Sequence, residues 1–481
     1  MPKYASLSQI QAEIQAGKTT CVQLVEYYLQ RIEATKHLNA YVEVFAEEAL
    51  ARALVLDKKY KAHPESVGKL FGAIISLKDV ICYEGHEVTA GSKILRGFRS
   101  LFSATAVERV LAEDAIIIGR TNCDQFAMGS DNTNSVYGSV LNAADETRVP
   151  GGSSGGAAVS VQADTCLVAL GSDTGGSVRQ PAAWCGVVGF KPTYGRISRH
   201  GLLAYGSSFD QIGTISHAVG DAAKFLEVMA GSDEFDATTS AQSVEKYSQN
   251  LDKNKKTYKI AYFDKALNPN GLSKEILEKT HKTIEILRGH GHTVEAVAFD
   301  LLDYIIPAYY VLTTAEASTN LSRYDGIRYG YRAGGVKTLE DTYKQSRTEG
   351  FSEEVKRRIM LGAFVLSSGY YDAYYTKAQQ VRRLLSDRTA EIFKEYDLIL
   401  MPAAPTSAWK LGEKASDPVA MYLADIFTVQ ANMVGIPAIS LPIGLDTEGL
   451  PIGLQFMADK WCEGELLAFG HYFCNEKNFR V

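Results

Sequence analysis

The sequence has 481 residues, of which 46% are hydrophobic and 22% are charged, and its formal net charge is −6 at pH 7. This balance is typical of a globular protein, and the length predicts one very large domain or two fused ones. The net negative charge argues against a chain that binds nucleic acid through its own electrostatic field. No apolar run reaches the roughly 18 residues of a membrane span. The polar N-terminus also lacks the apolar segment of a secretion signal, so we expect a cytoplasmic protein that binds neither DNA nor a membrane.

Residues 1–65 are predicted to be helical. Ser6-x-x-Gln9 and Thr20-x-x-Gln23 are capping boxes, and each opens a run with helical apolar periodicity. Gly17 stands where the first of these helices should end, because glycine readily adopts the left-handed conformation that closes a helix.

Short apolar runs alternate with helical stretches over residues 66–230. This alternation predicts a sheet covered by helices on both faces. The runs that predict strands are Phe71–Leu77, Ala115–Ile118 and Cys166–Leu170, and the stretches that predict helices are Thr105–Glu113 and Gly155–Asp164. Gly and Ser are most frequent between residues 129 and 213, and open α/β sheets place their sites in such turns at strand ends.

The remainder of the chain is predicted to contain a helical segment followed by further strands of the sheet. Residues 270–395 have a mainly helical pattern, and strand-like runs resume over residues 396–481. Because strand material lies on both sides of the helical segment, we predict one continuous domain over residues 1–481. Its fold class is α/β: an α/β/α sandwich around a large mixed, mostly parallel sheet, with residues 270–395 as a helical insertion.

A serine follows two glycines in Gly171-Ser172-Asp173-Thr174-Gly175-Gly176-Ser177. Two glycines let the backbone turn sharply and aim successive N–H groups at one point, which suits a developing oxyanion. A serine that closes such a turn could attack the carbonyl group whose oxygen the N–H groups hold. A glycine-rich turn that binds phosphate, or nothing, is the alternative.

Lys78 offers a base for that serine. It follows the mainly apolar run Ala73-Ile74-Ile75-Ser76-Leu77, so its amine is expected in a desolvated place, where burial lowers a lysine pKa. A surface charge is the alternative for a single lysine at the end of a strand. None of the nine histidines lies within either Gly/Ser segment, although a histidine distant in sequence remains open as the base.

Gly151-Gly152-Ser153-Ser154-Gly155 formally matches the G-x-S-x-G nucleophile elbow of α/β-hydrolases. An elbow follows an apolar strand, whereas the residues before this segment, 146–150, are polar and end in proline. No Gly-Lys-Ser/Thr follows the glycines, so the segment is not a P-loop either. The seven cysteines contain no C-x-x-C pair, which predicts reduced structural thiols and no metal site.

Together, the three segments resemble the amidase-signature family. In that family a lysine, a serine preceded by a cis peptide bond in the G-G-S-S-G-G loop, and a serine after G-x-D-x-G-G form a Ser–cis-Ser–Lys triad. The resemblance assigns these roles, in the family's order, to Lys78, Ser153 and the nucleophile Ser177. It also implies the amidase-signature fold and an oxyanion hole made by the backbone N–H groups of Thr174, Gly175, Gly176 and Ser177.

Six further stretches carry a finer likeness: residues 125–130, 195–202, 208–213, 316–326, 355–359 and 368–375. On these stretches the chain most resembles, within the family, the glutaminase subunits of tRNA-dependent amidotransferases. That likeness extends nearly end to end and implies glutamine as the substrate. An arginine would then hold its α-carboxylate and an aspartate its α-ammonium. The implied substrate-binding residues are Met128, Gly129, Tyr309 (or Tyr310), Arg358 (or its neighbour Arg357) and Asp425. The chain departs from the usual pattern at Gln125 and Thr133, where the family has glutamate, and at Asp131, where it has a small hydroxyl residue.

The resemblance also implies partners. The chain is expected to hold no cofactor or metal of its own and to pass ammonia to the B subunit of an amidotransferase, which uses ATP and Mg²⁺ and makes most of the contact with Glu-tRNA(Gln). A small C subunit is expected to wrap this chain. Two alternatives compete with this function: a stand-alone amidase acting on small amides, and an inactive scaffold. The two charged pocket residues disfavour the first, and the intact set of lysine and two serines disfavours the second.

Overall fold

The computed structural model describes residues 2–253, 257–268, 271–413, 418–476 and 479. The strands are β1 (Tyr41–Val44), β2 (Ile74–Lys78), β3 (Ile116–Thr121), β4 (Val168–Asp173), β5 (Val188–Lys191), β6 (Gln211–Ser216), β7 (Lys259–Phe263), β8 (Thr293–Val297), β9 (Leu398–Pro402), β10 (Ala438–Leu445) and β11 (Pro451–Met457). The helices are α1 (Leu7–Gln15), α2 (Cys21–Ala34), α3 (Ala46–Ala62), α4 (Thr105–Ala112), α5 (Gly155–Gln162), α6 (Arg179–Cys185), α7 (Val219–Met229), α8 (Lys274–Gly289), α9 (Leu302–Asn320), α10 (Leu339–Gly350), α11 (Glu353–Val365), α12 (Lys377–Ile392), α13 (Pro418–Leu423), α14 (Val429–Val434) and α15 (Glu463–Asn475).

These strands form one 11-stranded sheet in the order β1-β3-β2-β4-β6-β5-β10-β11-β9-β7-β8. The predicted mixed sheet is confirmed, but the expectation that it is mostly parallel is wrong. Only β2 pairs in parallel with β3 and β4, and β7 with β8 and β9, whereas the other pairings among the described strands are antiparallel. The connections explain the difference, because a short hairpin such as the turn between β10 and β11 can join only antiparallel strands.

Helices cover both faces of the sheet. On one face α7 contacts both α4 and α15, and on the other α5 contacts α6. Strand β10 contacts both α15 and α6, and β6 contacts both α7 and α5, so the two sets of helices enclose the same strands. This arrangement is the predicted α/β/α sandwich, and it buries the central strands on both faces.

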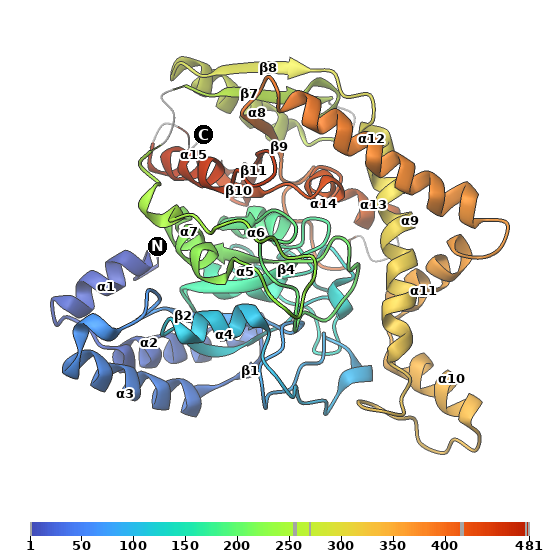
Figure 1. Ribbon diagram of the computed structural model, residues 1–481, viewed down its shortest axis with the longest axis horizontal. Helices are drawn as coiled ribbons and strands as arrows, with labels where there is room; N and C mark the ends of the chain where they lie inside the picture. Colours follow the sequence, from blue (N-terminus) through green and yellow to red (C-terminus); the bar gives the residue numbers. More distant parts are fainter. Residues whose placement is uncertain (1, 254–256, 269–270, 414–417, 477–478, 480–481) are drawn as a thin grey trace.

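The segment 270–395 is mainly helical, as predicted, but it also contains β8. Strand β8 pairs with β7, and α8 lies between them in sequence, so this part of the chain forms a parallel unit at one edge of the sheet. The segment from α9 to α12 forms the column of helices beside the sheet, yellow to orange in Figure 1. Strand β8 is short and mostly exposed, so its sequence lacks the apolar run that would predict a strand.

The N-cap bond of each predicted capping box is confirmed, whereas the return bond of Gln9 goes to the N–H of Ala5 and not to that of Ser6. Ser6 Oγ accepts a hydrogen bond from the backbone N–H of Gln9, and Thr20 Oγ1 accepts one from Gln23. Gly17, with φ +69°, follows the end of α1. These contacts satisfy N–H groups that the first turn of a helix leaves without partners.

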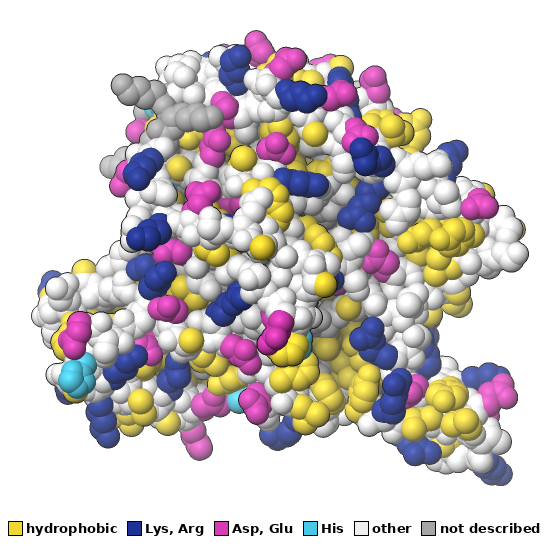
Figure 2. All heavy atoms as spheres, viewed as in Figure 1, with side chains coloured by type: hydrophobic (Ala, Val, Ile, Leu, Met, Phe, Trp, Pro, Cys, Tyr) yellow, Lys and Arg dark blue, Asp and Glu magenta, His cyan; other side chains and the backbone are white. Residues whose placement is uncertain are grey.

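The surface carries mixed charge. On the face shown in Figure 2, Lys and Arg side chains are interspersed with Asp and Glu. Within the described ranges, every helix is too short or too polar to cross a membrane. Five of the seven cysteines are buried as free thiols: Cys21, Cys82, Cys123, Cys166 and Cys185.

Candidate active site

The two strands that carry the candidate catalytic residues are neighbours. Strand β2 ends at Lys78, and β4, which pairs with β2 in parallel, ends at Asp173, just before the turn that contains Ser177. The carboxyl ends of adjacent parallel strands meet at one edge of a sheet, where open α/β folds place their ligands. The sheet therefore brings together two segments that are about a hundred residues apart in sequence.

The Lys78 side chain is completely buried among three serine hydroxyls. Its Nζ lies 2.7 Å from Ser153 Oγ, 2.9 Å from Ser154 Oγ and 2.9 Å from Ser172 Oγ. The peptide bond between Gly152 and Ser153 is cis, as the resemblance implies. Sequence reasoning missed the contacts of Ser154 and Ser172, although both lie inside the Gly/Ser motifs beside the predicted residues.

Burial lowers the pKa of Lys78 to about 8, against the opposing effects of Cys123, Asp124, Asp173 and Asp210, which raise it. A lysine with this pKa is neutral in roughly a tenth of the molecules at pH 7, whereas an ordinary lysine is almost entirely charged. The direction agrees with the prediction from the apolar strand. Lys78 is therefore suited to accept a proton near neutral pH.

Ser177 lies in the turn between β4 and α6 and is 6% exposed. Its backbone carbonyl accepts a hydrogen bond of 3.2 Å from the N–H of Ser154, so the Gly/Ser loop runs beside it. Ser153, by contrast, follows a loop and not a strand. The elbow interpretation of Ser153 is thus excluded by the local structure, and Ser177 itself occupies a strand-to-helix turn.

The predicted oxyanion hole needs one correction. The N–H of Gly176 already donates a hydrogen bond of 2.9 Å to Asp173 Oδ1, so it is not free for a substrate oxygen. In the part of the chain that the structure describes, the N–H groups of Thr174, Gly175 and Ser177 have no acceptor. Asp173 lies just before the turn, and its carboxylate also accepts a hydrogen bond of 3.2 Å from the N–H of Val178, so it binds the N–H groups on either side of Ser177.

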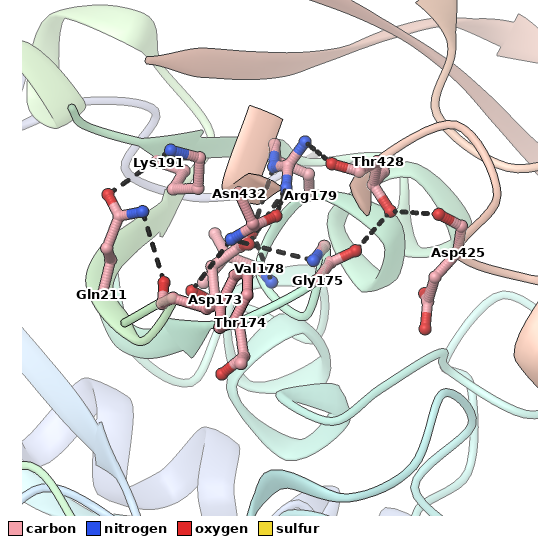
Figure 3. Close-up of polar contacts among 12 residues, drawn as sticks. Asp173, Thr174, Gly175, Val178, Arg179, Lys191, Gln211, Asp425, Thr428 and Asn432 are labelled. Carbon is pink, nitrogen blue, oxygen red and sulfur yellow. Dashed lines mark hydrogen bonds and ion pairs between the residues drawn. The ribbon is translucent and has the colours of Figure 1, made fainter. Parts of the chain in front are cut away.

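Asp173 also binds Arg179, the first residue of α6, and the pair is completely buried (Figure 3). Burial alone raises the pKa of Asp173, but Arg179, together with Lys191 and Asn432, outweighs burial and the pKa falls to about 2. Arg179 further donates hydrogen bonds of 2.9 Å to the carbonyl of Thr428 and of 2.7 Å to Asn432 Oδ1. Sequence reasoning missed this network, because its members lie on distant segments of the chain.

Asp425, predicted to bind the substrate ammonium, is buried, and only one of its two carboxylate oxygens has a hydrogen-bond partner among the described residues. Its Oδ2 accepts a hydrogen bond of 2.6 Å from Ser130 Oγ, while its buried Oδ1 has no partner among the described residues. Burial raises the pKa of Asp425 to about 7, although Ser130 and Arg358 lower it. A buried carboxylate oxygen without a donor is costly, so a ligand that donates a hydrogen bond to Asp425 Oδ1 would offset this cost.

Arg358 is buried among aromatic rings. Its Cζ lies 5.5 Å from the ring centroid of Tyr205 and 5.4 Å from those of Tyr310 and Tyr422. Its Nη1 donates to Tyr205 Oη at 2.7 Å and its Nε to Glu354 Oε1 at 2.8 Å. No partner in the described chain binds Nη2. The neighbouring Arg357, the alternative candidate, is more exposed and forms an ion pair with Glu354.

A cavity of about 290 Å³ lies between the loop after β3 and the start of α11. Met128, Gly129 and Arg357 line it, together with Asp131 and Tyr422. Tyr422 belongs both to this wall and to the aromatic cluster around Arg358, so the cavity is adjacent to that arginine.

Tyr309, the remaining predicted pocket residue, packs against the nucleophile turn. A Cβ atom at Gly175 would lie 2.5 Å from its hydroxyl oxygen, so only glycine allows this contact.

The three departures from the family pattern make local contacts around this cavity. Gln125 Oε1 accepts a hydrogen bond of 2.7 Å from the N–H of Ser352, the N-cap of α11. Asp131 Oδ1 accepts hydrogen bonds from both the N–H and the hydroxyl of Thr133.

Within the described residues, no group of three or more His, Cys, Asp and Glu side chains is arranged to hold a metal ion.

The chain is similar to known proteins over nearly its whole length. A family model described as Amidase matches residues 23–467. Over 466 residues the chain is 49% identical to the A subunit of glutamyl-tRNA(Gln) amidotransferase from Prosthecochloris aestuarii, with 97% of each chain covered. A crystal structure of the A subunit of the same enzyme from Thermotoga maritima superposes with a TM-score of 0.80 at 35% identity, covering 99% of this chain and 96% of that one. The peptide amidase from Stenotrophomonas maltophilia gives a TM-score of 0.81 at 28% identity, covering 98% and 96%.

Proposed function

Because the chain belongs to the amidase family, we propose that it hydrolyses the side-chain amide of glutamine, with Ser177 as the nucleophile. We further propose that it supplies the released ammonia within a tRNA-dependent amidotransferase that converts Glu-tRNA(Gln) to Gln-tRNA(Gln). The observation that carries glutamine as the substrate is the buried Oδ1 of Asp425, which lacks a partner among the described residues. An α-ammonium group would satisfy this oxygen, whereas a simple amide would leave it unpaired.

Arg358 would hold the other charged end of the substrate. Its Nη2 is without a partner in the described chain, and a guanidinium edge matches a carboxylate in geometry and charge. Tyr309 and the cavity wall at Met128 and Gly129 would flank the aliphatic part of glutamine. These contacts would place the side-chain amide over Ser177, and such positioning converts binding energy into rate.

The chemistry would begin with the neutral form of Lys78. In the reacting complex Ser177 Oγ would come within hydrogen-bond distance of Ser153 Oγ. As Ser177 Oγ attacks the amide carbon, its proton would pass to Ser153 Oγ while the Ser153 proton passes to Lys78 Nζ, 2.7 Å away. The free N–H groups of the 174–177 turn would stabilise the oxyanion, each donor being worth about 10² to 10³ in kcat. The proton returns by the same route to the departing ammonia, and water then hydrolyses the glutamyl ester on Ser177.

The ammonia would be used by partner proteins. In the proposed complex the B subunit uses ATP and Mg²⁺ to activate Glu-tRNA(Gln) and provides most of the tRNA contact, and the C subunit holds the complex together. The relatives named as the A component of glutamyl-tRNA(Gln) amidotransferase support this assignment at up to 49% identity. The mixed surface charge supports it too, because the chain lacks the strongly basic field of a protein that binds tRNA alone.

The experiment is glutamine hydrolysis by the purified full-length chain, alone and co-expressed with the B and C subunits of its own genome, beside Ser177→Ala. We expect ammonia release from wild type and a loss of at least about 10³-fold in the variant. Ser207→Ala, at a loop serine outside the proposed triad, is the control. Activity toward acetamide but not glutamine would favour the stand-alone amidase, and full activity of Ser177→Ala would exclude Ser177 as the nucleophile.

A further inference from the structure

Thr428 connects the nucleophile turn to the C-terminal part of the chain. It is completely buried at the start of α14, and its Oγ1 donates a hydrogen bond of 2.7 Å to the carbonyl oxygen of Gly175. Its own carbonyl oxygen accepts a hydrogen bond of 2.9 Å from Arg179 Nη1. Figure 3 shows Thr428 between the turn and Asp425. One residue thus contacts the turn and the helix that follows it.

The peptide group between Gly175 and Gly176 is held at both ends. Thr428 binds its carbonyl oxygen, and Asp173 binds its N–H at 2.9 Å. Because a peptide group is planar, two fixed ends determine its orientation. That orientation determines in turn where the flanking N–H groups, those of Gly175 and Ser177, can point.

Gly176 makes this contact possible. Its φ is +130°, and a Cβ atom there would lie 2.0 Å from Thr428 Oγ1 and 2.5 Å from Thr428 Cβ. No other residue could accept the threonine at this distance without displacing the turn. The second glycine of the motif is therefore required by the approach of Thr428 as well as by its own backbone conformation.

The same threonine is tied to the proposed ammonium site. The N–H of Thr428 donates a hydrogen bond of 3.0 Å to the carbonyl oxygen of Asp425, which also lies 3.1 Å from Thr428 Oγ1. Asp425 and Thr428 are thus the two ends of one compact turn. A displacement of this turn would move the proposed partner of the substrate ammonium and the support of the oxyanion hole together.

We propose that Thr428 is a positioning residue for the oxyanion hole: its hydroxyl holds the Gly175–Gly176 peptide so that the N–H groups of Gly175 and Ser177 face the reacting carbonyl oxygen. The inference rests on the proposed function in taking Ser177 as the nucleophile and, for the link to bound substrate, Asp425 as the ammonium site. Through the turn to Asp425, Thr428 also sets the distance between the bound amino acid and the hole.

The test compares Thr428→Val, which keeps the shape but removes the hydroxyl, with Thr428→Ser, which keeps the hydroxyl. Both are made in the full-length chain, in complex with its partners where glutamine hydrolysis requires them. Each is assayed on glutamine and on p-nitrophenyl acetate, an ester that needs Ser177 and the hole but has no charged groups for Asp425 and Arg358. Thr280→Val is the matched control, because Thr280 is also completely buried and donates to a backbone carbonyl, that of Ile276, in α8.

Thr428→Val should lower kcat by about 10- to 100-fold on both substrates, with KM for glutamine changed far less, since a misplaced donor affects the transition state most. Thr428→Ser should retain most of the activity. Thr280→Val should match Thr428→Val in thermal stability loss but keep wild-type kcat. The proposal is overturned if Thr428→Val stays within about twofold of wild type in kcat, if only KM rises, or if Thr428→Ser is as impaired as Thr428→Val. A wild-type chain that hydrolyses the ester but not glutamine would refute the proposed function and still test this inference.

Discussion

Lys78 Nζ lies 2.7 Å from Ser153 Oγ, and both side chains are completely buried. The short contact matters because burial has lowered the pKa of the lysine to about 8. A base and a hydroxyl at this distance can exchange a proton without any movement of the backbone. The relationship leads to two predictions about the proposed relay.

The first concerns pH. A lowered pKa means that the neutral amine forms at lower pH than in an ordinary lysine, so kcat/KM for p-nitrophenyl acetate should rise with pH and level off above about 8. Lys78→Arg should abolish the rise and leave at most about 1% of the activity, because arginine stays charged. Lys274→Arg, at an exposed lysine of α8, is the control. A wild-type profile already flat from pH 6 would contradict Lys78 as the base.

The second prediction distinguishes the roles of the two adjacent serines that contact Lys78, Ser153 and Ser154. Ser154 Oγ donates its proton to the Ser172 carbonyl at 3.1 Å, whereas Ser153 Oγ contacts only Lys78 among the described residues. The Ser153 proton is therefore free to move and the Ser154 proton is not. Ser153→Ala should lower kcat by about 10²- to 10⁴-fold, and Ser154→Ala by about tenfold or less, in steady-state glutamine hydrolysis. Equal losses would show that the relay is not specific to Ser153.

The third distinguishes the two neighbouring arginines. Arg358 is buried with a partner on Nε and Nη1, while Arg357 is more exposed and paired with Glu354. Arg358→Lys should raise KM for glutamine by about 10- to 100-fold, because lysine cannot offer the two parallel N–H groups of a guanidinium. Arg357→Lys should leave KM within about twofold. The reverse result would move the carboxylate site by one residue.

The fourth prediction concerns the effect of pH on stability through Asp425, whose pKa in the folded chain, about 7, lies above the ordinary value of 3.8. When folding raises the pKa of a carboxyl group, the free energy of unfolding is highest below the pKa of the group in the unfolded chain. It falls as the pH rises through the pKa of the group in the folded chain. At pH 8 the wild-type chain therefore contains a buried charge that Asp425→Asn lacks. The variant should be more stable by on the order of 1–3 kcal/mol at pH 8, with the difference vanishing near pH 4. Its KM for glutamine should rise about 100-fold.

Asp221 provides the matched control for this fourth experiment. Burial raises its pKa to about 7 as well, but it lies in α7 and binds the N–H of Leu7, away from the nucleophile turn. Asp221→Asn should reproduce the pH-dependent gain in stability, measured by urea unfolding, and leave KM unchanged. A rise in KM for both variants would mean that Asp425 acts through stability and not through substrate contact.

The sequence allowed the prediction of what depends on neighbouring residues. The caps at Ser6 and Thr20 are local, and the site motifs place Lys78, Ser153 and Ser177 within single short segments. The cis peptide bond and the proposed glutamine-binding residues could be expected only from the family resemblance. The direction of the strands could not be predicted, because it depends on the connections and not on the apolar runs.

The supports of the site were also beyond prediction. Asp173 lies 259 residues from Asn432, which donates to its Oδ1, and nothing in either local sequence identifies the other. The occupied N–H of Gly176 was missed for the same reason: the motif shows which residues can form a turn of N–H groups, but the side chain that captures one of them is known only from the structure.

The distance in sequence between the nucleophile and its supports has a consequence for synthesis of the chain. A ribosome releases the segment with Lys78, Ser153 and Ser177 long before residues 425–432, and domains complete their cores only when all their strands are present. A nascent or truncated polypeptide that ends before Asp425 therefore contains the two serines and the lysine. It lacks Thr428, which binds the Gly175 carbonyl, and Asp425, the proposed partner of the substrate ammonium. A chain cut before Asp425 is therefore expected to lack glutamine hydrolysis even though it contains all three proposed catalytic residues.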